Sequence, residues 1–188
     1  MVSTASTMLE LGTSAPEFSL LEPLTGKNIS LSDYADTPVL VAFVCNHCPY
    51  VVHIMDAFTE FAREYQSKGL ETIAINANDV ANYPDDSPEK MIELAKQNDF
   101  SFRYLFDESQ QTAKAYRAAC TPDFFLFEKE HTLVYRGQFD SARPKNDSPI
   151  TGADMRAAAT TVLNGEVPGP DQIASLGCNI KWKEGNSP

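Results

Sequence analysis

The segment PVLVAFVC, from Pro38 to Cys45, constrains the fold more than any other part of the chain. Every residue after its proline is apolar, and three of them are valines, a residue type that favours strands. An apolar run of strand length predicts a strand that is buried on both faces of a sheet. Because such a strand must be covered from both sides, we expect an α/β domain in which helices flank a central sheet.

Alternating strand and helix patterns around this segment predict a mixed sheet. Residues 12–37 contain two short strands around a turn at Thr25-Gly26, followed by a helical turn at 30–34. The patterns after the central strand predict, in order, a helix that ends at Lys68-Gly69, a strand at 70–78, a helix at 88–100, a strand at 102–109, a helix at 110–119, an antiparallel pair of strands within 123–137 and a helix at 151–164. We expect one domain over residues 1–165, with an extension at 166–188 packed on it.

The charge balance excludes several classes of partner. The 188 residues include 15 Lys and Arg against 26 Asp and Glu, a net charge of −11, whereas nucleic acids and anionic membranes attract a basic face. The chain has no apolar run of about 18 residues for a membrane span and no signal-like N-terminal segment. We therefore expect a cytoplasmic protein that binds neither nucleic acid nor membrane and keeps its four cysteines mostly reduced.

Two of the cysteines form a CxxC motif, Cys45-Asn46-His47-Cys48, where the central strand ends and the first long helix begins. The N–H groups and the dipole of a helix N-terminus stabilise a thiolate, and a lower thiol pKa gives more nucleophile at neutral pH. A helical projection puts Cys48 near the apolar stripe of the helix and Cys45 nearer its exposed tip. This predicts an exposed attacking thiol, Cys45, and a more buried resolving thiol, Cys48. The alternative is two core cysteines that share this spacing by chance.

A second motif, Cys120-Thr121-Pro122, precedes the predicted strand DFFLF. Together with APEFSL, LSDY, PVLVAF and the CxxC, it resembles the thioredoxin-fold redoxins over about residues 10–165. The resemblance is nearest to the alkyl hydroperoxide reductase/thiol-specific antioxidant (AhpC/TSA, peroxiredoxin-like) family. It implies a thioredoxin-like three-layer α/β fold with an N-terminal β-hairpin and a C-terminal extension.

The resemblance also implies roles for the residues of the two motifs. The protein would be a thiol–disulfide oxidoreductase in which Cys45 attacks a disulfide and Cys48 resolves the mixed disulfide. Pro122 would be a cis-proline that, with Thr121, faces the dithiol. His47 fills the second intervening position, as in the disulfide-introducing and protein disulfide isomerase-type members. Such a histidine stabilises the nearby thiolate and makes the disulfide more oxidising; the alternative is a solvated histidine with no such effect.

Peroxide reduction is an alternative function that rests on the resemblance alone. Peroxiredoxins carry a Pro-x-x-x-Thr/Ser-x-x-Cys motif, which is absent here. If the motif cysteine is Cys48, its Thr/Ser position is occupied by Cys45, and if the motif cysteine is Cys45, that position is occupied by Ala42. Ala42 also occupies the position of the buried proton-accepting Asp of thioredoxins. We therefore expect water or His47 to accept protons.

A Cu(I) or Zn²⁺ site is an alternative of another class, because Cys45, His47 and Cys48 offer soft ligands, with His53 further along the helix. Adjacent positions at a helix start rarely converge on one ion, so we expect no bound metal. No phosphate loop or dinucleotide motif stands out, and we expect no organic cofactor.

The roles of Cys120 and Cys178 stay open at this stage. Each is either a packed thiol, since cysteines are among the most buried residue types, or an additional redox thiol. Cys178 lies in LGCNIKWK, where Ile180 and Trp182 are expected to dock the extension on the domain. The expected partners are a protein or small-molecule disulfide or a hydroperoxide, and a thiol reductant. A second copy of this chain, in a homodimer, is a further candidate partner.

Overall fold

The central strand lies in the middle of a seven-stranded sheet in the computed structural model, which describes residues 3–188. β4 (Val39–Phe43) pairs in parallel with β5 (Glu71–Asn76) and antiparallel with β8 (Asp123–Phe127). The other strands of this sheet are β2 (Ser19–Glu22), β3 (Lys27–Ser30), β6 (Arg103–Phe106) and β9 (Leu133–Arg136). The strand order is β3-β2-β6-β5-β4-β8-β9. The predicted mixed sheet is confirmed, including the N-terminal hairpin of β2 and β3.

Both faces of β4 are buried, as its apolar sequence predicts. Leu40 and Ala42 belong to one hydrophobic cluster, and Val39, Val41 and Phe43 belong to a second cluster on the opposite face. All five side chains have an exposed fraction of zero, which follows from the alternation of side chains along a strand. The sheet therefore separates two hydrophobic layers, each of which needs a cover of its own.

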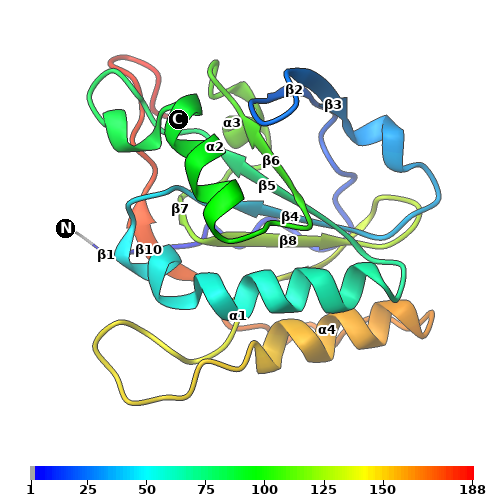
Figure 1. The fold of residues 1–188 in the computed structure, drawn as a ribbon. Coiled ribbons are helices and arrows are strands. Elements are labelled where there is room, and N and C mark those ends of the chain that lie inside the picture. The colour runs from blue at the N-terminus through cyan, green and yellow to red at the C-terminus, as the bar shows by residue number, and fades with distance from the viewer. Residues whose placement is uncertain (1–2) are drawn as a thin grey trace.

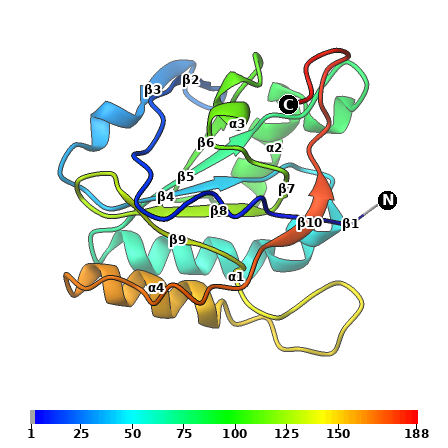
Figure 2. The same ribbon diagram turned by 180° about the vertical axis from the view of Figure 1, so that it is seen from behind.

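Helices cover the two faces unequally (Figures 1 and 2). Three helices contribute to the cluster that contains Leu40: α1 (Pro49–Gln66), α2 (Pro88–Gln97) and α4 (Ala153–Leu163). α1 and α4 lie side by side, and the Tyr65 hydroxyl of α1 lies within hydrogen-bonding distance of the Thr160 hydroxyl of α4, 2.9 Å away. The opposite cluster is covered by α3 (Gln111–Ala115), by the 3₁₀ turn η1 (Leu31–Tyr34) and by N-terminal residues. A second 3₁₀ turn, η2 (Pro84–Asp86), precedes α2.

The predicted helix over 110–119 is shorter in the structure. α3 spans only Gln111–Ala115, because Gln110 and Arg117 have positive φ angles of 63° and 51°, which interrupt the helix. No helix among residues 3–188 is long and apolar enough to cross a membrane.

A second, three-stranded sheet is absent from the predicted elements. It consists of β1 (Ser3–Ala5), β10 (Leu176–Asn179) and β7 (Cys120–Thr121), in the order β1-β10-β7. β10 belongs to the C-terminal segment, which continues with Ile180, buried in the second cluster, and Trp182, packed against it. Figure 2 shows β10 crossing between the N-terminal strand and the end of β7. The C-terminal segment therefore contributes a strand beside the second sequence motif.

Candidate active site

The CxxC motif lies at the N-terminus of α1. Cys45 follows the end of β4, Cys48 is the N-cap residue of α1, and Pro49 is its first helical residue. Proline is tolerated there because its missing N–H group has no intrahelical partner at that position. All four cysteines are thiols in this structure.

The predicted exposure of Cys45 is wrong. Its side chain is buried, with an exposed fraction of 1%, and Cys48 is fully buried. The helical projection used only the angular position of Cys45 relative to α1, whereas the residue that buries its side chain belongs to a distant segment of the chain. The Cys45 Sγ lies 3.4 Å from the Thr121 hydroxyl, which belongs to β7.

Thr121 contacts both sulfurs of the dithiol. Its hydroxyl faces Cys45, and its carbonyl oxygen accepts a hydrogen bond from the Cys48 thiol, with a distance of 3.1 Å. The following peptide bond, Thr121–Pro122, is cis, as the family resemblance implies. The two sequence motifs, more than seventy residues apart along the chain, therefore meet as one arrangement of two thiols and a cis-proline turn.

The electrostatics of the pair favour a thiolate on Cys48. The hydrogen bond from the Cys45 thiol is the main cause that lowers the pKa of Cys48 to about 5, and hydrogen bonds from the Cys178 side chain and the Val51 backbone N–H lower it further against the effect of burial. The same hydrogen bond to Cys48, with burial and the nearby Asp86 carboxylate, raises the pKa of Cys45 well above its usual value. Cys48, at the helix N-terminus where N–H groups stabilise a negative charge, is therefore the more acidic of the two thiols.

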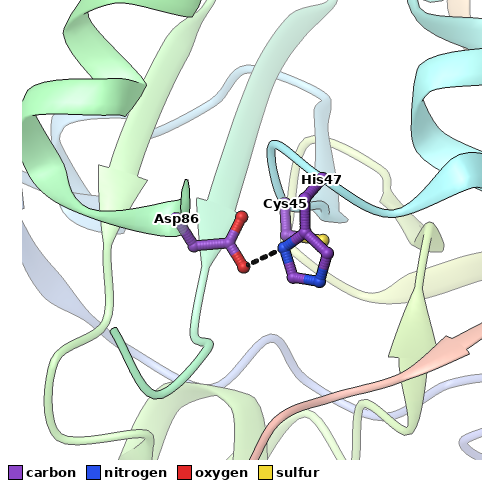
Figure 3. A group of neighbouring side chains, drawn as sticks. All are labelled: Cys45, His47 and Asp86. Atoms are coloured by element: carbon purple, nitrogen blue, oxygen red, sulfur yellow. Dashed lines mark ion pairs between the residues drawn. The ribbon is translucent and has the colours of Figure 1, made fainter. Parts of the chain in front are cut away.

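Asp86 is a component of the site that the sequence analysis missed. It lies in η2, has an exposed fraction of zero, and accepts hydrogen bonds of 2.7 Å from the Asn46 backbone N–H and from the Asn78 side chain. Its Oδ2 atom also lies 2.7 Å from the Nδ1 atom of His47 (Figure 3). The His47 ring stacks on Tyr83, with 5.8 Å between ring centres. Asp86 therefore fixes both residues between the two cysteines of the motif.

The order of the strands could have predicted that the loop after β5 lies at the site, but not that Asp86 is its buried carboxylate. The carboxyl ends of the parallel strands β4 and β5 lie at one edge of the sheet, where loops gather around a site. Residues 79–88 follow β5 at this edge of the sheet. Two adjacent carboxylates occur in this loop, and only the structure distinguishes the buried Asp86 from the exposed Asp85.

The predicted metal ligands do not come together as one group. In the part of the chain that the structure describes, Cys45, His47 and Asp86 form one group of possible metal ligands. Their ligand atoms lie within 4.8 Å of one another. The thiol of Cys48, the third ligand in the sequence hypothesis, instead donates to the Thr121 carbonyl. The Asp86 oxygens already accept two protein hydrogen bonds, which an ion would have to displace. The geometry therefore favours a hydrogen-bonded network over an ion site.

The two remaining cysteines have different surroundings. Cys120 is fully buried, its thiol donates a 3.4 Å hydrogen bond to the Pro122 carbonyl, and burial raises its pKa far above the usual value. Cys178, on β10, lies opposite Thr121 in the strand register, and its side chain is hydrogen-bonded to that of Cys48. The structure therefore joins Cys178 to the dithiol and leaves Cys120 in contact with the cis-proline turn.

Replacing Asp86 by asparagine tests the role of this carboxylate. Because its charge raises the pKa of Cys45, its removal should lower that pKa and shift the pH profile of Cys45 alkylation to lower pH. An amide cannot accept all the hydrogen bonds that the carboxylate accepts, so we also expect a loss of about 1–3 kcal/mol in the free energy of unfolding. Iodoacetamide labelling followed by mass spectrometry, and urea denaturation, measure the two effects.

The matched control is Asp85→Asn, which removes the same charge from the exposed neighbouring position. This variant should keep the alkylation profile and the stability of the unmodified protein. Identical alkylation profiles for both variants would show that Asp86 does not act on Cys45.

Comparisons with known proteins agree with this geometry. The AhpC/TSA family model matches residues 11–136. A curated relative, the thiol-disulfide oxidoreductase ResA of Bacillus thuringiensis subsp. konkukian, is 28% identical over 131 residues, which cover 70% of this chain and 71% of the relative.

Solved structures extend the likeness to 97% of the chain. An uncharacterized conserved protein from Geobacillus kaustophilus is 44% identical, with a TM-score of 0.95 over 97% of both chains. A putative thioredoxin from Neisseria meningitidis, 23% identical, has a TM-score of 0.59 over 78% of this chain and 87% of that one. This second likeness shows that the fold is thioredoxin-like. The first one includes the C-terminal segment that carries β10.

Proposed function

The chain belongs to the AhpC/TSA family, and from this premise and its buried dithiol we propose that it is a thiol–disulfide oxidoreductase. The observation that carries the proposal is the pair Cys45 and Cys48 at the N-terminus of α1, both in contact with Thr121 of the cis-proline turn. The name of the ResA relative supports the same reaction class.

The proposed reaction has two exchange steps. The Cys45 sulfur, its proton passing along the hydrogen bond to Cys48, attacks one sulfur of a substrate disulfide, and the other substrate sulfur leaves as a thiolate that takes up a proton. Cys48 then loses its proton to water and attacks the Cys45 sulfur of the mixed disulfide. The Cys45–Cys48 bond forms, the bond between Cys45 and the substrate breaks, and the second substrate sulfur leaves as a thiolate that takes up a proton. The substrate disulfide is reduced to two thiols, and the Cys45–Cys48 pair is oxidised to one disulfide.

Access favours Cys45 as the attacking thiol even though Cys48 is the more acidic of the two. The Cys48 Sγ points to the Thr121 carbonyl and to Cys178, both of which are buried. Cys45 lies instead beside His47, whose side chain is 26% exposed (Figure 3). A substrate disulfide approaching past His47 meets Cys45 first.

The order of the two thiols is tested by alkylation with a limiting amount of iodoacetamide at neutral pH, followed by peptide mapping. We expect the first modified residue to be Cys45, and turnover of a model disulfide with dithiothreitol to be lost in Cys45→Ser. Cys120→Ser, which removes another fully buried cysteine, is the control and should keep turnover. First modification of Cys48 would reverse the assigned roles, and turnover in Cys45→Ser at the unmodified rate would refute the proposed function.

Peroxide reduction is the second candidate, because the Thr121 hydroxyl lies 3.4 Å from the Cys45 Sγ and can donate to the oxygen that leaves a peroxide. In that reaction Cys45 would become a sulfenic acid, and Cys48 would displace water to form the same disulfide. Sulfenate trapping in Cys48→Ser after addition of hydrogen peroxide tests it. A rate equal to that of a free thiol would exclude a peroxidase role and leave the disulfide reaction unaffected.

A further inference from the structure

A strand of the C-terminal segment places a third thiol at the dithiol. In the antiparallel register of β10 and β7, Cys178 lies opposite Thr121 and Asn179 opposite Cys120. Thr121 is also the residue whose carbonyl accepts the hydrogen bond from Cys48. One residue therefore connects the strand that carries Cys178 to the sulfur of Cys48.

Close packing at Gly177 fixes this approach. A Cβ atom at position 177 would overlap the Thr121 carbonyl oxygen, and it would lie 2.5 Å from the carbonyl carbon and 3.0 Å from the Pro122 nitrogen. Only glycine lets the backbone of β10 come this near to the cis-proline turn. The neighbouring Cys178 side chain is held in the same buried cluster as Cys45 and Cys48.

The immediate surroundings of Cys178 favour exchange with Cys48 in particular. The two side chains are hydrogen-bonded to each other, and the Tyr50 backbone N–H and the Lys181 ammonium stabilise negative charge on Cys178. Burial and the neighbouring Cys48 sulfur nevertheless raise the pKa of Cys178 to about 12. Cys178 is therefore well placed but weakly ionised, so its attack should be slower than that of Cys48 and should accelerate with pH.

We propose that Cys178 is a third redox thiol, which exchanges with the Cys45–Cys48 disulfide and forms a disulfide with Cys48. The proposal rests on the proposed function, which supplies the oxidised pair. The Cys178 sulfur, once deprotonated, attacks the Cys48 sulfur; the Cys48–Cys178 bond forms, the Cys45–Cys48 bond breaks, and Cys45 leaves as a thiolate that takes up a proton. The protein keeps one disulfide throughout, so this step needs no additional oxidant or reductant.

The exchange would assign the reaction with the substrate and the reaction with the reductant to different sulfurs, whereas a two-cysteine site uses one disulfide for both. Cys45, which meets the substrate, returns to the thiol form, while the disulfide that a reductant must open lies between α1 and β10. The same bond would tie the C-terminal segment covalently to the helix that carries the CxxC motif. Oxidation would thereby fix β10 against the cis-proline turn.

The test is the disulfide pattern of the full chain after oxidation by glutathione disulfide, quenched in acid, alkylated and digested with trypsin. Cleavage after Lys and Arg places Cys45 and Cys48 in the peptide 28–63 and Cys178 in the peptide 157–181. In Cys45→Ser we expect these two peptides to be cross-linked through Cys48 and Cys178, at a rate that rises about tenfold per pH unit below the thiol pKa. In the unmodified protein we expect the Cys45–Cys48 disulfide together with a fraction of the cross-linked peptides.

Two further variants decide between the outcomes. Cys178→Ser should lose the cross-link and keep the Cys45–Cys48 disulfide, and Cys120→Ser should keep both. If oxidised Cys45→Ser carries only glutathione on Cys48, and the unmodified protein contains no cross-linked peptides, Cys178 is a packing residue and the proposal is refuted. Absence of the Cys45–Cys48 disulfide itself in the unmodified protein would instead refute the proposed function. The unmodified protein and Cys178→Ser give the answer even if Cys45→Ser does not fold.

Discussion

Cys48→Ser is expected to stop the reaction at the mixed disulfide between Cys45 and the substrate. A resolving thiol in contact with the attacking sulfur acts at an effective concentration far above the millimolar level of an added thiol. Its removal should therefore lengthen the lifetime of the mixed disulfide by at least about 100-fold and reduce multiple turnover by a similar factor. Intact-protein mass spectrometry during turnover measures the trapped species, and peptide mapping locates it at Cys45.

The same variant separates the roles of the thiols around it. Cys178 interacts with Cys48 and lies opposite Thr121, so we expect it to exchange with Cys48 and not to replace Cys48 in attacking the Cys45 sulfur. The double variant Cys48→Ser/Cys178→Ser should consequently trap as much mixed disulfide as Cys48→Ser alone. Turnover of Cys48→Ser at the unmodified rate would mean that resolution does not depend on the CxxC pair.

The parts of the fold that the sequence predicts are those whose residues carry a local pattern. The apolar run after Pro38 becomes β4, buried on both faces, and the stripe that follows becomes α1. β1, β7 and β10 contain two to four residues each and carry no such pattern. They exist because distant segments pair, as Ser3 does with Cys178. β1 and β7 are too short to carry a pattern, and β10, although as long as the predicted strands β2 and β3, exists through its pairing with β1 and β7, so the second sheet was not predicted.

In the candidate site, too, the features with a local sequence pattern were predicted and those formed by distant contacts were not. The position of the dithiol at a helix start and the cis-proline follow from short motifs, the second with the help of the family resemblance. The burial of Cys45 and the presence of Asp86 do not, because the contacts responsible join residues 76 and 40 positions apart. Local spacing describes what one helix presents to its own surroundings, and it contains no information about the segments that later cover that helix.

Gly177→Ala is expected to cause the largest loss of stability among single-methyl changes in the C-terminal segment. The added Cβ would overlap the backbone carbonyl of Thr121, which cannot rotate away as a side chain can, so β10 or β7 must shift. Overpacking of this kind costs about 1–3 kcal/mol, and the shift would also weaken the contact between Cys178 and Cys48. We therefore expect a lower free energy of unfolding in urea and faster alkylation of Cys178 in the folded protein.

Gly169→Ala is the matched control, since it makes the same substitution in the same segment, where a Cβ would meet nothing within 4 Å. Neither glycine has a positive φ angle, so backbone preference does not distinguish the two variants. The control should change the free energy of unfolding by less than about 1 kcal/mol, through the unfolded chain alone. Equal stability and equal Cys178 alkylation in the two variants would mean that β10 can move away from the cis-proline turn without a loss of folding free energy. The position of Cys178 beside the dithiol would then be a loose contact, and a stable Cys48–Cys178 disulfide would have no structural basis.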